Sequence, residues 1–317
     1  MSPKRVLVTG GAGFIGSHVA EGYLARGWSV TVVDDLSSGK RENVPDGAEF
    51  IELDVADGDL RTLFRERSGF ELVNHHAAQI DVRVSVARPL FDAQVNVLGL
   101  INILEAAKEL GTRRVLFVSS GGVVYGDAEE RPIPETAPKR PESPYGVSKL
   151  AGEYYLRSYR RLHGLDYVAL RYSNIYGPRQ DPHGEAGVVA IFSNRIAARE
   201  TLTVFGDGNQ TRDYLYVGDV VEANMLLSDA EVDGDSALDD RAFNVGTGRE
   251  TSVNELAAIL MDGAGCQVAV EHVPARAGEL EWNSLQCDKL RDLGWEAALD
   301  LSEGLTRTYR AIAGSAE

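Results

Sequence analysis

Residues 6–16, with the sequence VLVTGGAGFIG, decide the fold of this 317-residue chain. Val6 to Val8 is a short apolar run rich in β-branched residues, which is typical of a buried strand. After Thr9, four closely spaced glycines follow it at positions 10, 11, 13 and 16. From Ser17 onward the apolar residues recur at helical spacing. The stretch therefore predicts a strand, a glycine turn and a helix in immediate succession.

This order is the local structure that binds the pyrophosphate of a dinucleotide. A side chain in the turn would keep the phosphates away from the N–H groups at the start of the helix, so glycine is needed there. The predicted cofactor-binding residues of the turn are Gly10, Gly13, Phe14, Ile15 and Gly16. A glycine-rich turn that binds nothing is the alternative interpretation.

The next predicted strand, residues 29–33, ends on Asp34 and Asp35, roughly twenty residues after the turn. An acid at this point can accept hydrogen bonds from both ribose hydroxyls, and it repels the additional phosphate of NADP. Lys40 and Arg41 follow closely and could compensate for that repulsion. The pattern favours NAD and leaves NADP open.

Further strands are predicted at 49–53, 70–75, 114–118 and 167–171, and they alternate with helices such as 89–110 and 144–162. Alternation of this kind predicts a parallel sheet with right-handed crossovers, an α/β fold of the doubly wound Rossmann type. After Ser173 the elements become short. We expect residues 1–173 to form the cofactor-binding domain. Residues 174–317 should mainly form a smaller C-terminal α/β substrate lobe, with some later segments returning to the sheet.

The carboxyl ends of parallel strands meet at the ligand-binding edge of such a sheet. Small residues, Ala77 and Ala78, follow the fourth predicted strand, and Asp54-Val55 follows the third. Asp54 could contact the adenine or simply open a turn. The neighbouring His75 and His76 lack a second cluster of metal ligands, so we interpret them as packing residues and expect no metal site.

Composition limits the classes of function. The hydrophobic fraction of 44% is ordinary for a soluble protein, and the net charge of −16 argues against nucleic acid as a partner. We expect no membrane span, because no apolar run approaches ~20 residues, and no signal peptide, because the first strand begins almost at once. Two cysteines without metal-ligand spacing fit a reducing cytoplasm.

Tyr145 and Lys149 lie four residues apart, so they share one face of the predicted helix. A free tyrosine has a pKa near 10, but a neighbouring ammonium and an oxidised nicotinamide both stabilise the phenolate. Such a tyrosine can remove the proton of a hydroxyl while the carbon gives up a hydride. Ser119 or Ser120, at the sheet edge, could hydrogen-bond the same oxygen.

Five motifs together make the chain similar to the extended short-chain dehydrogenases/reductases, and within them to the UDP-glucose (UDP-galactose) 4-epimerase family. The similarity covers essentially the whole chain. The motifs are TGGAGFIG at 9–16, VYG at 124–126, SPYGVSK at 143–149, RYSNIYGP at 171–178 and RDY at 212–214.

The resemblance implies an NAD cofactor, a UDP-sugar substrate and roles for further residues. It implies cofactor contacts also at Asn96, Ser119, Tyr145, Lys149 and Tyr172. It implies catalytic roles for Tyr145, Lys149 and a serine. The implied substrate-binding residues are Asn174, Gly187, Val188, Thr203, Phe205, Arg212, Tyr214, Arg276, Glu279 and Asn283. Two arginines can neutralise a diphosphate, although Arg212 beside Asp213 could instead form a plain surface ion pair.

The chain departs from the family at one catalytic position. The family's serine or threonine stands four residues before the tyrosine of VYG, where this chain has Gly121. Either Ser120 takes that role, which we expect, or the proton transfer depends on Tyr145 more directly. The following Gly122-Val123 offers no carboxylate of the kind that related dehydratases and decarboxylases carry there, which favours oxidation and re-reduction without elimination.

The predicted reaction is 4-epimerisation of a UDP-hexose through a 4-keto sugar. A UDP-uronic acid 4-epimerase and a sensor that has lost the chemistry are the alternatives. Asn283 falls at the position that the family uses to set the room beside the sugar C2 substituent, so we expect activity on the N-acetylated pair as well. The family pairs the helices at 89–110 and 145–162 into a four-helix bundle, which predicts a homodimer.

Overall fold

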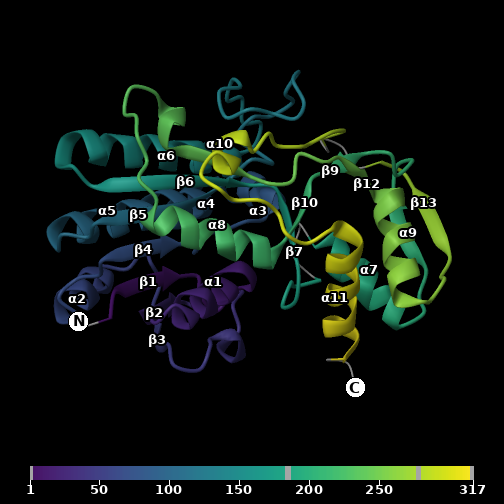
Figure 1. Cartoon of the computed structure of the whole chain (residues 1–317), viewed down its shortest axis with the longest axis horizontal. Helices are drawn as coiled ribbons and strands as arrows, with labels where there is room; N and C mark the ends of the chain where they lie inside the picture. The colour runs from purple at the N-terminus through teal and green to yellow at the C-terminus, as the bar shows by residue number, and fades with distance from the viewer. Residues whose placement is uncertain (1–2, 183–186, 276–279, 315–317) are drawn as a thin grey trace.

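A seven-stranded parallel sheet forms the centre of the protein (Figure 1). The computed structural model describes residues 3–182, 187–275 and 280–314. The strand order is β11-β6-β5-β4-β1-β2-β3, and every neighbouring pair is parallel. The strands are β1 (Arg5–Thr9), β2 (Ser29–Asp34), β3 (Glu49–Glu52), β4 (Leu72–His75), β5 (Arg114–Ser120), β6 (Asp166–Tyr172) and β11 (Ala242–Val245). This doubly wound arrangement confirms the fold class predicted from the sequence.

Helices cover both faces of this sheet. On one face α1 (Phe14–Ala25) packs against α8 (Val217–Asp229). On the other lie α2 (Asp59–Glu66), α5 (Gly99–Glu109) and α6 (Pro144–His163). Successive residues of β1 point to opposite faces, so Val6 and Val8 join one core while Leu7 joins the other. Burial on both faces explains the continuous apolar run that the sequence shows.

The helix predicted at 89–110 is continuous but not regular. It consists of α4 (Pro89–Ala93), a π-helical stretch (Gln94–Leu98) and α5, and it follows α3 (Val82–Ala87). Its 21 residues, Pro89–Glu109, are long and apolar enough to cross a membrane by length and composition. Polar and charged residues such as Asp92 and Glu105 interrupt it, so it is not an unbroken apolar run, and its length and composition alone are weak evidence for a membrane span. One face of this helix packs into the core, as in soluble proteins.

A smaller lobe follows β6 and stands beside the carboxyl edge of the sheet (Figure 1). Three helices, α7 (Val188–Ala197), α9 (Val253–Ala264) and α11 (Leu301–Gly314), pack together around its core. Three small strand pairs complete it. They are β7 (Asn174–Tyr176) with β10 (Tyr214–Tyr216), β8 (Leu202–Phe205) with β13 (Val270–Val273), and β9 (Thr211–Arg212) with β12 (Thr251–Ser252).

The chain crosses between the two parts more than once. α8 and β11 come after the first elements of the smaller lobe but pack on, or pair with, the central sheet. The short helix α10 (Asp288–Arg291) packs against β11. The smaller lobe is thus held to the sheet by several chain segments, which fixes its position at the carboxyl edge.

Candidate active site

A cleft of about 2250 Å³ lies between the carboxyl edge of the sheet and the smaller lobe. Nearly all residues predicted from the sequence line it. From the sheet side these are Gly10, Gly13, Phe14, Ile15, Gly16, Asp34, Asp54, Val55, Ala77, Ala78, Ser119, Ser120, Tyr145, Lys149 and Tyr172. From the lobe side they are Asn174, Gly187, Val188, Thr203, Phe205, Arg212, Tyr214 and Asn283. Arg276 and Glu279 lie outside the described residues.

The glycine turn forms a cradle that side chains would fill. A Cβ on Gly10, which has a φ of +67°, would lie 2.6 Å from the backbone nitrogen of Ala77. A Cβ on Gly16 would collide with the carbonyl oxygen of Gly10. Gly13 caps α1 without a side-chain hydrogen bond, and the first turn carries no acid. The N–H groups at the start of α1 are therefore open to an anion, as a dinucleotide pyrophosphate requires.

Asp34 ends β2 at the wall of the cleft and is held by two backbone donors. Its Oδ2 accepts a hydrogen bond from Ala12 N at 3.0 Å, and its Oδ1 accepts one from Leu36 N at 2.9 Å. Burial raises the pKa of the carboxyl, and these two N–H groups oppose the shift. Each oxygen keeps a lone pair for a ribose hydroxyl. Of the two nearby cations, Lys40 lines the cleft, whereas the Arg41 guanidinium lies 4.5 Å from the Phe50 ring centroid.

Tyr145 and Lys149 project from the first turns of α6. Ser143 starts this helix by accepting a hydrogen bond from Gly146 N on its Oγ, and Pro144 occupies the first turn. The Nζ of Lys149 donates to the carbonyl oxygen of Val118 at 2.9 Å and lies 5.7 Å from the Tyr145 ring centroid. Burial lowers the pKa of Lys149 to about 8. The ammonium of Lys149 thus lies beside the ring of Tyr145.

The two serines at the end of β5 face different surroundings. Ser119 Oγ donates to Oε1 of Glu153 at 2.6 Å, and Glu153 also forms a buried ion pair with Arg171. Sequence reasoning missed Glu153, although its position one helical turn beyond Lys149 was a signal. Ser120 lines the cleft without that carboxylate partner. Of the two hydroxyls, that of Ser119 is therefore the one held by a buried carboxylate.

Gly121 is glycine for a packing reason. A Cβ there would lie 2.9 Å from Cδ2 of Leu285, and closer still to Cδ1. Leu285 is completely buried. A side chain at position 121 would therefore enter the core and not the cleft, so the residue could not supply a hydroxyl to substrate in this chain.

Asn96 does not line the cleft, unlike the other described cofactor-binding residues of the prediction. Its side chain is buried, and it donates to the carbonyl oxygen of Gln79 and accepts from Gln79 N. Its Nδ2 also donates to Asp92. Because these bonds use the amide, Asn96 holds the backbone after β4.

The alternative interpretation of Arg212 as half of a surface ion pair with Asp213 is wrong. Asp213 is completely buried, and its two oxygens accept hydrogen bonds from Thr247, Gly248 and Leu285. Arg212 lines the cleft. A second cation from the lobe, Arg195, also lines it, with a hydrogen bond to Thr203 Oγ1, and sequence reasoning missed it.

Asn283 is 2% exposed at the lobe side of the cleft. Its Nδ2 lies 3.4 Å from the carbonyl oxygen of Gly121, and its Oδ1 is buried with no hydrogen-bond partner among the described residues. An unpaired buried amide oxygen is unfavourable, so this atom is suited to accept a hydrogen bond from a ligand.

The two histidines at the end of β4, His75 in the strand and His76 just after it, have no metal-binding geometry. His75 Nδ1 lies 2.7 Å from Thr9 Oγ1, and burial lowers the pKa of both rings, that of His76 to about 3. Within the described part of the chain, no group of three or more His, Cys, Asp and Glu side chains could hold a metal ion. Asp54 Oδ1 accepts a hydrogen bond from Ala56 N, so it opens a turn and also lines the cleft.

Residues 6–246 match the model of the NAD dependent epimerase/dehydratase family. The chain belongs to this family. Among solved structures, it is 43% identical to the UDP-glucose 4-epimerase of Thermotoga maritima determined with UDP-glucose, with a TM-score of 0.94 over 99% of this chain and 100% of that one. It is 45% identical to the Thermus thermophilus UDP-glucose 4-epimerase complex with NAD, with a TM-score of 0.90 over 98% and 99%.

A third relative within the family has a different name. The chain is 34% identical to the UDP-N-acetylglucosamine 4-epimerase of Methanobrevibacter ruminantium determined with UDP-N-acetylmuramic acid. The TM-score is 0.91, and the alignment covers 99% of this chain and 100% of that chain. Family membership and these relatives agree with the resemblance that the sequence motifs indicate.

Proposed function

We propose that the protein is an NAD-dependent UDP-glucose 4-epimerase that interconverts UDP-glucose and UDP-galactose. The observation that carries this proposal is the meeting of the Tyr145–Lys149 pair and the glycine cradle in one cleft. A sensor without chemistry would not need this pair. The close relatives that are UDP-glucose 4-epimerases support the same function.

The sheet side of the cleft holds the cofactor in this proposal. The turn at Gly10–Gly16 takes the pyrophosphate, and Asp34 takes the adenosine ribose. The chemistry that NAD supplies when bound is reversible acceptance of the sugar C4 hydride. Oxidation gives a 4-keto sugar, and re-reduction on its other face gives the epimer.

Tyr145 removes the proton of the C4 hydroxyl and later returns it. The Lys149 ammonium stabilises the phenolate, and its carbonyl partner at Val118 keeps it beside the tyrosine. Ser120 hydrogen-bonds the same sugar oxygen and helps the proton move. No carboxylate stands at Gly122-Val123, so no group there promotes elimination.

The lobe side binds the nucleotide part of the substrate. Arg212, together with Arg276, neutralises the diphosphate, and Asn174 with the start of α7 adds hydrogen bonds. Thr203 and Phe205 on β8 form the wall for uracil. Residues 1–173 thus mainly bind NAD, and residues 174–317 mainly bind the UDP-sugar.

The enzyme also acts on UDP-N-acetylglucosamine and UDP-N-acetylgalactosamine in this proposal. Asn283 is smaller than the tyrosine that restricts related enzymes, and its amide can hydrogen-bond an N-acetyl group. Its buried Oδ1, which has no protein partner among the described residues, supports this assignment. The relative named as a UDP-N-acetylglucosamine 4-epimerase also supports this assignment.

The test of the main proposal compares wild type with Tyr145→Phe. The purified protein is incubated with UDP-galactose, and the sugars are separated by chromatography. Wild type should form UDP-glucose, and Tyr145→Phe should form none while binding UDP-galactose with similar affinity in calorimetry, because only the hydroxyl is removed. A wild type that binds UDP-galactose without converting it would support the sensor alternative and refute the proposal.

A second copy of the chain covers an apolar surface on α3, α4, the π-helical stretch at 94–98 and α6 in this proposal. Leu90 is 87% exposed and Leu162 is 72% exposed, and Val86, Leu98 and Tyr154 are also exposed. These helices lie together on one side of the sheet (Figure 1). Apolar surface of this kind marks an interface. The family resemblance points to a homodimer, located in the cytoplasm as the two free cysteines allow.

Light scattering tests the assembly. Wild type should have twice the 34.4 kDa mass of the chain, and Leu90→Glu should shift the protein toward the single-chain mass. A wild type that has the single-chain mass at micromolar concentration would contradict the homodimer.

A further inference from the structure

Asp213 sits next to Arg212 in sequence but is directed away from the cleft into the protein. Its Oδ1 accepts hydrogen bonds from Thr247 N at 2.9 Å and Thr247 Oγ1 at 2.6 Å. Its Oδ2 accepts from Gly248 N at 2.9 Å and Leu285 N at 3.1 Å. One carboxylate, 0% exposed, therefore receives four donors from two distant segments.

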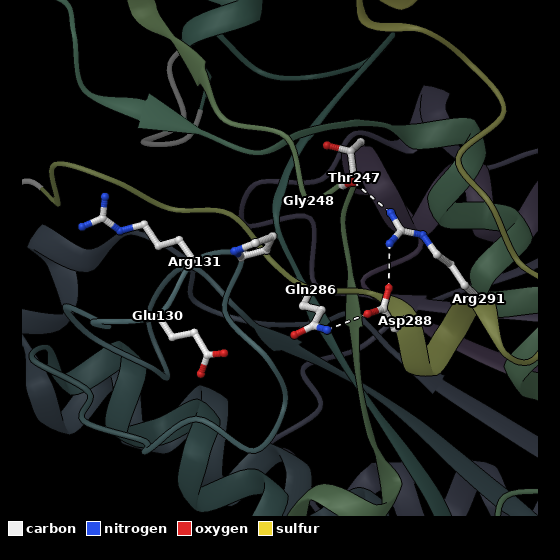
Figure 2. A pocket seen from close by; sticks show the side chains of 8 residues that line it. Glu130, Arg131, Thr247, Gly248, Gln286, Asp288 and Arg291 are labelled. Atoms are coloured by element: carbon white, nitrogen blue, oxygen red, sulfur yellow. Dashed lines mark hydrogen bonds and ion pairs between the residues drawn. The ribbon is translucent and has the colours of Figure 1, made fainter.

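The first of these segments is the turn at 246–248, which follows β11. A Cβ on Gly246 would lie 2.5 Å from Asp213 Oδ2, so only glycine lets the turn approach the carboxylate. Figure 2 shows the outer side of the turn, where Arg291 reaches both Thr247 and Asp288. Arg291 Nη2 donates to the carbonyl oxygen of Thr247 at 3.0 Å. The turn is thus held from both sides.

The second segment, 283–285, forms the wall at the sugar end of the cleft. Asn283 lines the cleft, and Leu285 fills the space beside Gly121, next to Ser120. Ser284 accepts a hydrogen bond on its carbonyl oxygen from Ile133 N at 2.8 Å. A shift of Leu285 N away from Asp213 would move both the Asn283 amide and the packing behind the catalytic serine.

The backbone of Asp213 also reaches the nucleotide side. Its carbonyl oxygen accepts a hydrogen bond from Asn174 N at 2.9 Å, and Arg212, the last residue of β9, immediately precedes it. The residues assigned to the nucleotide and the wall assigned to the sugar therefore share this one residue. A carboxylate suits the position because all four groups that face it are donors.

We propose that Asp213 is a positioning residue. It sets the distance between the nucleotide-binding residues Arg212 and Asn174 and the segment 283–285, which forms the wall beside the sugar. The inference rests on the proposed function, because it assigns the sugar to the wall at Asn283. In Asp213→Asn, the amide nitrogen must face either the two Thr247 donors or the Gly248 and Leu285 donors. The two donors that face the amide nitrogen then lose their acceptor, and repulsion between donor groups moves them away from the side chain.

The experiment compares Asp213→Asn with Asp219→Asn. Asp219 is a matched control because it is also buried, accepts hydrogen bonds from Ala298 N and Leu299 N, and does not line the cleft. Kd is measured by calorimetry for UDP and for UDP-glucose in both variants, together with Tm. Both variants should melt below wild type.

Of the two aspartate variants, Asp213→Asn alone should raise the ratio of the UDP-glucose Kd to the UDP Kd. We expect an increase of about tenfold, because the displaced wall would lose a hydrogen bond to the sugar. Thr247→Val removes one of the four donors and should change the ratio in the same direction by a smaller factor, which covers the case that Asp213→Asn does not fold. If the ratio were unchanged in both Asp213→Asn and Thr247→Val, the positioning role of Asp213 would be refuted, while the proposed function would stand. Wild type that binds neither ligand would overturn the proposed function and the inference with it.

Discussion

Gly121→Ala tests the packing that excludes a side chain from the family's catalytic position. The backbone of Gly121 is not in the left-handed region, so alanine can adopt its conformation. Alanine also reduces the conformational entropy of the unfolded chain, which should stabilise the folded protein by about 0.4–1 kcal/mol. Against this, the new Cβ would lie 2.9 Å from Cδ2 of the fully buried Leu285. Overpacking of this kind costs about 1–3 kcal/mol.

The overpacking is the larger effect, so Gly121→Ala should lower the free energy of unfolding by about 1–2 kcal/mol. Leu285→Ala should lower it by about 2–5 kcal/mol because it leaves a cavity. In the double variant the new methyl group enters that cavity. The double variant should therefore lose less stability than the sum of the two single variants, by about 1–2 kcal/mol.

Urea denaturation followed by tryptophan fluorescence measures the four proteins of this cycle. The turnover of UDP-galactose adds a second readout, because Gly121 adjoins Ser120. Gly121→Ser in a Ser120→Ala background should not restore turnover, since its hydroxyl would point toward Leu285. If Gly121→Ala were as stable as wild type, with additive effects in the cycle, the packing argument would be refuted.

Four further outcomes follow from the site. Ser120→Ala should reduce kcat by about 10²-fold if the hydroxyl assists proton transfer, and a near-normal rate would show that the role lies elsewhere. NAD should bind far better than NADP in calorimetry because of Asp34, and equal affinities would contradict this. Asn283→Tyr should lower kcat/KM for UDP-N-acetylgalactosamine relative to UDP-galactose, by roughly 1–3 kcal/mol in transition-state binding or more by steric exclusion, and an unchanged ratio would remove the residue from the pocket. Burial lowers the pKa of Lys149 to about 8 from 10.5, so the unfolded chain binds more protons between those values. Wild-type stability relative to Lys149→Met should therefore rise with pH from about 8 to 10.5 in urea titrations, and a flat difference would show that the pKa is not lowered.

The sequence by itself determined the features that depend on neighbours along the chain. The strand, glycine turn and helix over residues 5–25 follow from apolar periodicity and from the need for glycine in the turn. Tyr145 and Lys149 share a face because helical spacing places residues four apart side by side. Apolar periodicity also locates the ends of β2 and β5, so the sequence alone predicts that Asp34, Ser119 and Ser120 lie at the edge of the sheet.

Only the tertiary structure decided which distant residues meet at the site. Leu285, 164 positions further along the chain, occupies the space that a side chain at Gly121 would need. The carboxylate of Asp213 accepts hydrogen bonds from Thr247, Gly248 and Leu285. Asn96 has the residue type of a ligand contact, but folding turns its amide toward Gln79. Side-chain packing and hydrogen bonds between distant segments leave no periodic trace in the sequence, because they depend on how the sheet and the lobe come together.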